Sequence, residues 1–539
     1  MSAGTTGTAS GTRTREDSHR AWPAVRALAA AEAYRLLRHP LILGTLVVCS
    51  GLWIHETALS PVVHYPVLQY EDRALQLQLL LPAAGVFLAA HRAVLRPVRD
   101  GTGAWFDTLA VEPWQRAAAL LLALLPVTGL VTLTAGARTL WLVLLPESVG
   151  SPSPAELATG PAAVLLAGVL AVLTGTLSRS PAMGPLVLGA AGIVTVAAQI
   201  NPSPSASLRW LMVVVIDEGH QGLPARLLGR PAALHLLYLV LLAAVLGTAV
   251  LLLSGARGPG VRIAAALALA GTVAAGAAQL RPLSPSVAEA RTRVEHFPSP
   301  GQRCVREGRV TYCAFPEFLD RHRQWSGVAE RILSRVPERV LREGYTVRQR
   351  IAPLTGPGVV LDVPPLLEAW AADDRRAGTP GAAVVGTEWG VGSDGASDAV
   401  GGFASEFAHR VITAGPSGGS AEAGAMPLIC GGRGVVAVWL AAQATPETRT
   451  ALRSTLGRSS GDGVGFGGVL ATVDFGREEA EAAMRLLDLP GDGVAERVAR
   501  HWDELTAAGT TLPRAAGLLG GSAREPAARH ADSEARCAR

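Results

Sequence analysis

The chain has 539 residues, of which 49% are hydrophobic and only 17% are charged, and this balance argues against an ordinary soluble protein. All 48 basic residues are arginine; because a P-loop needs a lysine to reach phosphate, the chain is not itself a conventional ATPase. The net charge of +4 is small and spread along the chain, so no nucleic-acid-binding surface is expected.

The N-terminal segment is polar, and we expect residues 1–20 to form a disordered cytoplasmic N-terminus. No cleaved leader is predicted, because residues 1–40 hold no uncharged hydrophobic stretch. RALAAAEAYRLLRHP, residues 26–40, predicts a helix that Pro40 ends. Its charged residues do not share one face, so a helix lying in the membrane interface and an ordinary juxtamembrane helix both remain open; these residues are Arg26, Glu32, Arg35 and Arg38.

Long apolar segments dominate the next part of the chain. A bilayer core requires about 20 mostly apolar residues per helix. Seven segments meet or nearly meet this length: residues 41–59, 74–90, 117–135, 161–177, 181–200, 231–253 and 263–280. A single soluble core cannot bury seven such segments. The sequence therefore predicts a polytopic α-helical membrane domain of about seven transmembrane helices over residues 21–280.

Arginine counts predict the orientation of this domain. With a cytoplasmic N-terminus, the inner segments hold 13 arginines, whereas outer loops of similar total length hold five. Cytoplasmic loops carry the excess of basic residues, so this orientation is favoured. An odd number of spans then places everything after residue 280 outside. We expect a multi-pass protein of the plasma membrane with an extracytoplasmic C-terminal domain.

The interiors of the predicted spans carry few polar groups. Gln76 and Gln78 are the most polar residues well inside any span, whereas His91, Arg138 and His235 lie near span ends. Ion-coupled carriers usually keep an ionisable residue at membrane depth. An ion-coupled secondary transporter is therefore not expected.

The longest inner connection is HRAVLRPVRDGTGAWFDTLAVEPWQR, residues 91–116. It predicts a turn at Asp100-Gly101 and a short helix that starts at Thr102 and ends before Pro113. Two aromatic residues, Trp105 and Phe106, lie on that helix. They either anchor at the membrane interface or dock into a partner protein.

Taken together, these segments resemble a type-2 permease, the membrane subunit of ATP-binding cassette transporters. The resemblance covers about residues 20–255 and is carried by residues 35–40, Arg99-Asp100-Gly101-Thr102, residues 105–109 and the Pro-x-x-Arg step at 113–116. It implies a separate ATPase subunit, which would contact the inner loop at Arg99, Gly101, Thr102, Trp105 and Phe106. It also implies a second membrane subunit in a homo- or heterodimer. The stretch 201–230 is similar to the outer hairpin of that family.

The chain departs from the family pattern in two places. Val111-Glu112-Pro113 stands where the family has a Leu-Pro step, and a seventh span carries an appended domain. We expect residues 281–519 to fold as a soluble α+β domain and residues 520–539 to form a disordered tail. Helical patterns cover residues 316–337, 478–489 and 494–506; residues 347–351 alternate like a strand, and residues 435–442 form a buried segment of undecided type.

Residues 281–539 contain only weak matches to catalytic motifs. GPSGG, residues 415–419, spells G-x-S-x-G around Ser417, but a glycine-rich stretch follows where a nucleophile elbow needs a helix. His501 or His530 would have to complete the triad. GVGFGG, residues 463–468, lacks the βαβ context of a dinucleotide site, and no HExxH is present. We therefore assign no catalytic, cofactor-binding or metal-ligating residue and expect no cofactor in this chain.

Five cysteines occur, and two of them are nine positions apart in QRCVREGRVTYC. No partners at zinc-site spacing accompany them. A two-residue turn at Gly308-Arg309 places Cys304 opposite Cys313 in a β-hairpin, at a distance that a disulfide accepts. Because disulfides persist outside the cytoplasm, the sequence predicts a structural disulfide between Cys304 and Cys313.

Three functions remain open at this stage. The first is the permease subunit, with the lipid bilayer and a separate ATPase as partners and no enzymatic activity of its own. The second is a non-transporting membrane receptor or scaffold whose outer domain binds a ligand. The third is a membrane-tethered extracytoplasmic hydrolase.

Overall fold

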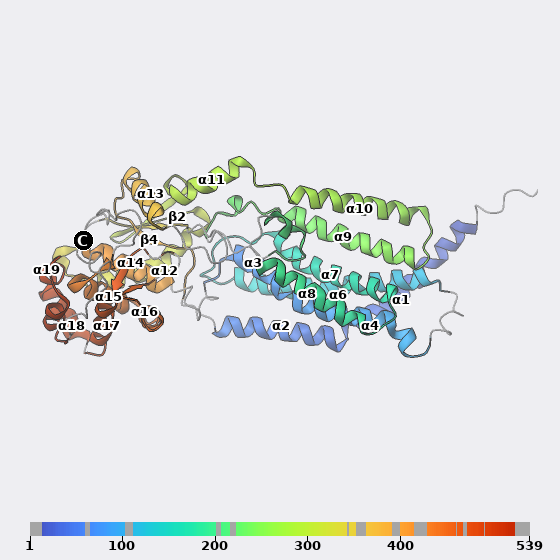
Figure 1. Ribbon diagram of the computed structural model, residues 1–539, viewed down its shortest axis with the longest axis horizontal. Helices are drawn as coiled ribbons and strands as arrows, with labels where there is room; N and C mark the ends of the chain where they lie inside the picture. The colour runs from blue at the N-terminus through green and yellow to red at the C-terminus, as the bar shows by residue number, and fades with distance from the viewer. Residues whose placement is uncertain are drawn as a thin grey trace, which may run out of the picture.

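The computed structural model describes residues 13–59, 65–102, 111–200, 206–215, 222–341, 344–351, 363–390, 399–413, 428–459, 461–466, 470, 472–489 and 491–522. Two parts follow each other along the long axis of the molecule (Figure 1). A helical bundle is followed by a C-terminal domain of helices and two small sheets. The end of the bundle that contacts this domain is called the domain end below, and the opposite end is called the far end.

The described helices of the bundle are α1 (Arg13–Leu37), α2 (Pro40–Leu59), α3 (Leu68–Gln78), α4 (Leu80–Arg99), α6 (Pro113–Val143), α7 (Pro154–Leu177), α8 (Met183–Ile200), α9 (Ala232–Leu253) and α10 (Pro259–Gln279). Among them, six stretches are long and apolar enough to cross a membrane, with α3 and α4 counted as one. The prediction of a bundle of apolar, membrane-length helices is therefore confirmed, with six such stretches where seven were predicted. The predicted segment 181–200 corresponds to α8, which is apolar but shorter than the other six.

Several helices are longer than the apolar segments predicted. The second predicted span extends at both ends, from Leu68 to Arg99, with a break only at Leu79. The residues from His91 to Arg99 therefore lie on a helix and not in a loop. Likewise α7 begins at Pro154, because Ser153 caps its first turn by accepting a hydrogen bond from the backbone N–H of Glu156.

Apolar side chains lie both inside and outside the bundle. Val127, Val164 and Ala90 are fully buried between the helices. On the outer surface, Leu133 and Ile193 are each 72% exposed. A water-soluble bundle would carry polar residues on this surface. The apolar exterior is that of a helical bundle with lipid as its solvent.

The C-terminal domain contains the helices α11 (Pro285–His296), α12 (His322–Leu333), α13 (Val363–Arg376), α14 (Ala399–Thr413), α15 (Gly431–Ala444), α16 (Pro446–Arg458), α17 (Arg477–Leu486), α18 (Gly491–Arg500), α19 (Trp502–Leu505) and α20 (Leu512–Leu518). Its first sheet has the order β1-β2-β3-β4, with β1 (Arg303–Glu307), β2 (Val310–Ala314), β3 (Tyr345–Gln349) and β4 (Ala383–Val385). The second has the order β5-β7-β6, with β5 (Leu428–Ile429), β6 (Gly463–Gly465) and β7 (Asp474–Gly476).

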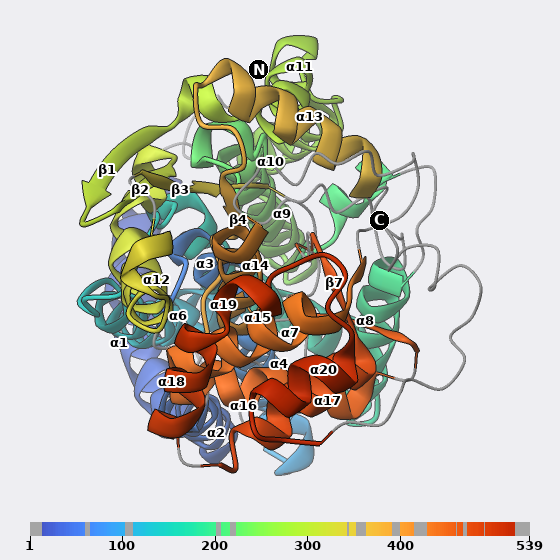
Figure 2. The same ribbon diagram turned by 90° about the vertical axis from the view of Figure 1, so that its left-hand side faces the viewer.

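Helix α15 lies at the centre of the C-terminal domain. Residues 435–442, the buried segment of undecided type, are all at most 1% exposed within it. A helix that is apolar all round has no periodic pattern to distinguish it from a buried strand. Helices α12, α14, α16, α17, α19 and α20 pack around α15, whereas α11 and α13 lie apart from it (Figure 2). Strand β3 and helices α12 and α17 confirm three of the remaining predicted elements, although residues 316–321 form a separate 3-10 helix before α12. The predicted helix 494–506 is divided into α18 and α19.

Two buried arginines follow one another along β3 and its end. Arg348 and Arg350 are at most 3% exposed. Arg350 pairs with Asp373 at 2.8 Å and with Asp374 at 2.6 Å, and Arg348 pairs with Asp374 at 3.0 Å. These ion pairs fix α13 against the sheet, and the charges compensate one another as buried charges require.

The predicted hairpin disulfide is present. Strands β1 and β2 are antiparallel with Cys304 opposite Cys313, and the two residues are bonded. Gly308 has a φ of +57°, which the tight turn requires. Cys430 is also disulfide-bonded, although from its glycine-rich sequence we expected it to be unpaired. Cys49 is free and buried in α2, and Cys537 lies outside the described residues.

Candidate functional site

The predicted contact loop begins where α4 ends, at the far end of the bundle. Gly101 has a φ of +67°, and the N–H of Thr102 donates to the carbonyl of Pro97 at 3.0 Å. This is a glycine-terminated helix end. The predicted turn at Asp100-Gly101 is therefore confirmed. The Arg99 side chain, 63% exposed, contacts Asp100 at 3.2 Å.

The two aromatic residues of the predicted loop cannot be placed. Trp105 and Phe106 lie outside the described residues, as does the short helix predicted to carry them. The chain continues at Val111, and α6 starts with Pro113 in its first turn. Of the predicted contact residues, the structure thus brings together Arg99, Gly101 and Thr102 on one exposed turn.

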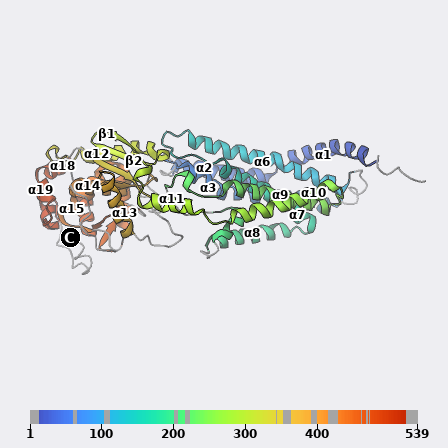
Figure 3. The same ribbon diagram turned by 90° about the horizontal axis from the view of Figure 1, so that it is seen from above.

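Helix α1 packs against the bundle beside this turn. A stripe of small apolar residues faces inwards at helical spacing: Val25, Ala29, Ala33 and Leu36. Figure 3 shows α1 running alongside α6 and extending past the far end. This arrangement favours a juxtamembrane helix over one lying flat in the interface. Alanines are weak markers of a buried face, which explains why the charged residues alone gave no clean pattern.

One ion pair ties α1 to α4. Glu32 lies 2.9 Å from Arg96, and it also lies 3.0 Å from Arg35 on its own helix. The Glu32 side chain is 14% exposed and that of Arg96 is 32% exposed. A pair with this much exposure contributes only modestly to stability, about 0.5 kcal/mol. This ion pair therefore adds little to the apolar packing that holds α1 on the bundle.

The domain end is built differently, around a fully buried arginine. Arg321 of the C-terminal domain donates to the carbonyl of Glu147 at 2.7 Å and to that of Tyr65 at 3.0 Å, both on loops of the bundle. Burial lowers the pKa of the Arg321 guanidinium to about 10, so it stays charged at neutral pH. Charge-assisted hydrogen bonds to carbonyls then satisfy a charge that is withdrawn from water.

An apolar cluster at the same seam joins four segments of the chain. It comprises residues from the start of α3, the loop before α7, the connection before α9 and the C-terminal domain: Val67, Val149, Leu223, Leu227, Phe315, Phe318 and Ile351. Two further hydrogen bonds cross the same seam, from the N–H of Gly150 to the carbonyl of Glu317 at 2.9 Å and from the N–H of Ala225 to the Glu317 carboxylate at 2.9 Å. The C-terminal domain is packed onto the bundle like part of a common core.

Buried charges lie just inside the bundle from this seam. Glu156 on α7 pairs with Arg230 at 2.7 Å, with side chains only 7% and 5% exposed. Gln76 donates to Glu156 at 2.5 Å, and Asp72 accepts from the N–H of Ser153 at 2.8 Å. Sequence reasoning missed this cluster because it placed the start of the fourth span at residue 161. Ser153-Pro154, a typical helix start, is the signal that would have found it.

A second set of polar contacts connects three helices nearby. Arg138 on α6, 8% exposed, pairs with Glu71 on α3 at 2.8 Å. The indole N–H of Trp53 on α2 donates to Gln78 at 2.7 Å. Ionisable residues do therefore occur in the helices. The pairs of Glu156 and Arg138 lie towards the domain end, whereas His91 and the arginines of α4 lie towards the far end.

Other residues considered from sequence give no further site. Ser417 and His530 lie outside the described residues, and Gly463, Gly465 and Phe466 belong to or follow the short strand β6. Within the described ranges, no group of three or more His, Cys, Asp or Glu residues is placed to hold a metal ion. Comparison of the chain with protein-family models, curated proteins and solved structures gives no match.

Proposed function

We propose that this chain is the membrane-spanning permease subunit of an ATP-binding cassette transporter. It moves a substrate across the plasma membrane with ATP that a separate ATPase subunit hydrolyses. A second membrane subunit, the same chain or a related one, completes the path. The proposal rests on the sequence resemblance of residues 20–255, and the geometry of the far end supports it.

The single structural observation that supports the resemblance is the exposed turn at the end of α4. Arg99 ends this helix, Gly101 and Thr102 follow it, and the helix is tied to α1 by the partly exposed Glu32–Arg96 pair. A displacement of this turn would move α4 and also α3, which precedes α4 with only Leu79 between them and reaches the domain end. A turn placed in this way suits a membrane subunit whose conformation is changed by a partner bound outside the membrane.

The orientation follows the same proposal. The far end is cytoplasmic, in agreement with the arginine count, and α8 serves as the seventh span beside the six longer stretches. The C-terminal domain is then extracytoplasmic, where the Cys304–Cys313 disulfide is stable. Because Arg321 and the surrounding apolar cluster hold this domain on the bundle, it acts as a fixed outer vestibule that receives or hands on substrate.

Co-purification tests the proposal. The chain, extracted from its own membranes, is expected to bring down an ATPase subunit of the cassette type, identified by its P-loop and ATP hydrolysis. Replacing Trp105 and Phe106 by Ala is expected to lower the recovery at least about tenfold, because aromatic anchors dominate interfaces. Trp141→Ala is the matched control, since Trp141 is 57% exposed on α6 away from this loop. Purification with no such ATPase would reject the proposal.

A receptor or scaffold is the second candidate, and one cavity favours it. The C-terminal domain has a cavity of about 350 Å³ that faces the bundle loop carrying Tyr65. Arg331, Trp389 and Glu447 are among the residues that line it, a combination of charge and aromatic surface typical of ligand sites. A chain that binds a ligand here and has no ATPase partner would be a receptor.

A further inference from the structure

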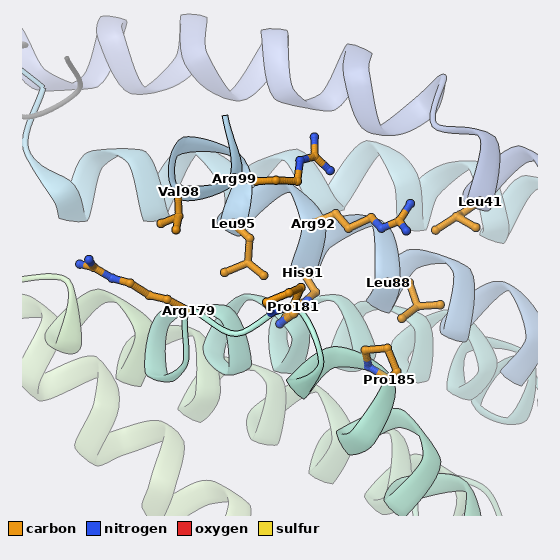
Figure 4. Close-up of a pocket in the computed structure, with 10 residues that line it drawn as sticks. All are labelled: Leu41, Leu88, His91, Arg92, Leu95, Val98, Arg99, Arg179, Pro181 and Pro185. Atoms are coloured by element: carbon orange, nitrogen blue, oxygen red, sulfur yellow. The ribbon is translucent and has the colours of Figure 1, made fainter. Parts of the chain in front are cut away.

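A cavity of about 400 Å³ opens at the far end of the bundle between α2, α4 and the start of α8 (Figure 4). Its walls are mainly apolar and include Leu41, Leu88 and Leu95. The surfaces beside it are apolar too: Val47 on α2 is 70% exposed and Leu186 on α8 is 64% exposed. The cavity thus lies next to surfaces whose solvent is lipid.

Positive charge surrounds this cavity. Arg92 and Arg99 come from α4, and Arg179 comes from the turn between α7 and α8. Figure 4 shows the three guanidinium groups fanning out around the rim and not meeting at one point. Among the described residues that line the cavity, none is acidic, although Asp100 next to the lining pairs with Arg99 at 3.2 Å. A bound molecule therefore meets an apolar interior and a broad cationic rim.

A buried polar group also lines the cavity. His91 is 2% exposed, and its Nε2 atom has no hydrogen-bond partner within the described part of the chain. The helix of Gly184 packs closely on the other side of the ring, since a Cβ at this glycine would lie 2.6 Å from the Nδ1 atom. An unpaired ring nitrogen in an apolar site is costly, by roughly 1–3 kcal/mol. Because the Nε2 atom itself is buried, a ligand in the cavity would reach it only if the His91 ring turned towards the cavity.

We propose that the cavity binds one phospholipid with an anionic headgroup from the adjacent leaflet. The acyl part lies against Leu41, Leu88 and Leu95, and the headgroup phosphate lies at the cationic rim. Basic pockets between transmembrane helices bind anionic headgroups in this way. A soluble phosphate compound would leave the apolar walls uncovered, whereas the acyl chains of a lipid would cover them. The inference concerns lipid binding and stands whether or not the chain transports anything.

Lipid titration of the purified full-length chain in detergent tests this proposal. Binding of phosphatidylglycerol and phosphatidylcholine is measured by native mass spectrometry. The unaltered chain is expected to prefer phosphatidylglycerol. The double variant Arg92→Gln/Arg179→Gln is expected to lose about 30-fold of that preference, which corresponds to about 2 kcal/mol or roughly 1 kcal/mol per arginine. Phosphatidylcholine binding should change little.

Matched variants separate a built site from general surface charge. Arg257→Gln/Arg262→Gln removes one arginine from the α9–α10 connection and one from the first turn of α10, at the same end of the bundle. Less than about threefold change is expected. Val98→Trp, at a lining residue that is 51% exposed, should block both lipids without altering charge. Equal losses in the two double variants would overturn the proposal. Displacement of phosphatidylglycerol by inorganic phosphate at equal affinity would also overturn it and indicate a free-anion site.

Discussion

The two ends of the bundle are held together by different kinds of contact. At the domain end, Arg321 is fully buried and the Glu156–Arg230 pair is at most 7% exposed. At the far end, the Arg35 and Arg99 side chains are 60% and 63% exposed. Water therefore competes with Glu32 and Asp100 for hydrogen bonds to these two arginines. Breaking a buried pair leaves an uncompensated charge and costs several kcal/mol, whereas exposed pairs contribute little.

This difference indicates which parts of the molecule can move relative to one another. The C-terminal domain and the domain end of the bundle behave as one unit, because separating them would expose the apolar cluster and Arg321 to water. The far end has no comparable lock among its described residues. Under the proposed function, a partner that binds the turn after α4 contacts the end of the bundle with the weaker ion pairs.

The largest effect is expected from removing the charge of Glu156. Glu156→Gln leaves Arg230 buried without its carboxylate, and the free energy of unfolding is expected to fall by about 4 kcal/mol. Chemical denaturation in detergent measures this change. Glu496→Gln, at a pair whose side chains are 70% and 59% exposed, is the control and should cost less than about 1 kcal/mol. Equal effects in the two variants would contradict the comparison.

Arg321 provides the next largest test. Arg321→Ala leaves two bundle carbonyls without their donor, and the expected loss is about 3 kcal/mol. The C-terminal domain should also become easier to cleave from the bundle by limited proteolysis. Arg323→Ala is the control, since that side chain is 64% exposed two positions away. An Arg321→Ala chain with unchanged stability would mean that the seam does not depend on this residue.

The hairpin disulfide contributes within the C-terminal domain only. Cys304→Ser/Cys313→Ser opens a loop of nine residues, and loop-closure entropy gives an expected loss of about 2.5 kcal/mol. Unfolding followed by domain-specific fluorescence should show the loss in the C-terminal domain, with the bundle unchanged. A loss confined to the bundle would show that the hairpin has been assigned to the wrong part.

Acid pH should weaken the C-terminal domain through His409. Burial lowers the pKa of His409 to about 4 despite the nearby Glu406 carboxylate. Below pH 6.5, the ordinary pKa of histidine, His409 binds a proton in the unfolded chain but stays neutral in the folded chain until the pH falls to about 4. Stability is therefore complete above pH 6.5 and should fall by about 2 kcal/mol on going to pH 5.

His409→Gln should remove this pH dependence. Burial raises the pKa of Asp374 to about 6 against the pull of Arg350 and Arg348, and that group acts in the opposite direction. The difference between the original chain and the His409→Gln variant isolates the histidine. Identical pH profiles for both chains would show that His409 is not the cause.

The smallest effect is expected at the far end. Glu32→Gln breaks the pair with Arg96, which is partly exposed, and should lower stability by only about 0.5 kcal/mol. A thermal unfolding curve is sufficient to measure it. A loss as large as that of Glu156→Gln would mean that the far end is as rigidly locked as the domain end.

Much of the fold was predictable, because its strongest signals are local. Apolar runs predict the bundle helices, and the even spacing about Gly308-Arg309 predicts the hairpin and its disulfide. The central helix α15 was not assignable, since a fully buried segment has no polar face. The seam around Arg321 was not predictable either. Its partners at residues 65 and 147 are backbone carbonyls, which any residue type supplies, and they lie far from it in the sequence.

In the candidate site too, local features were predictable and long-range contacts were not. The turn at Asp100-Gly101 was predictable because glycine readily adopts the positive φ of a helix end, and the structure confirms it. The buried face of α1 depends on alanines, and the ion pair between Glu32 and Arg96 joins residues 64 positions apart. Long-range pairs of this kind need the packed bundle to define them.

Site-directed labelling tests most directly the claim that the two ends lie on opposite sides of a membrane. In a Cys49→Ser background, Thr102→Cys and Arg306→Cys are compared in intact cells with a membrane-impermeant maleimide, without reduction, and the Cys49→Ser parent gives the background. Arg306→Cys should react from outside, and Thr102→Cys should react only after the membrane is opened. Reaction of both positions from the same side would contradict the account.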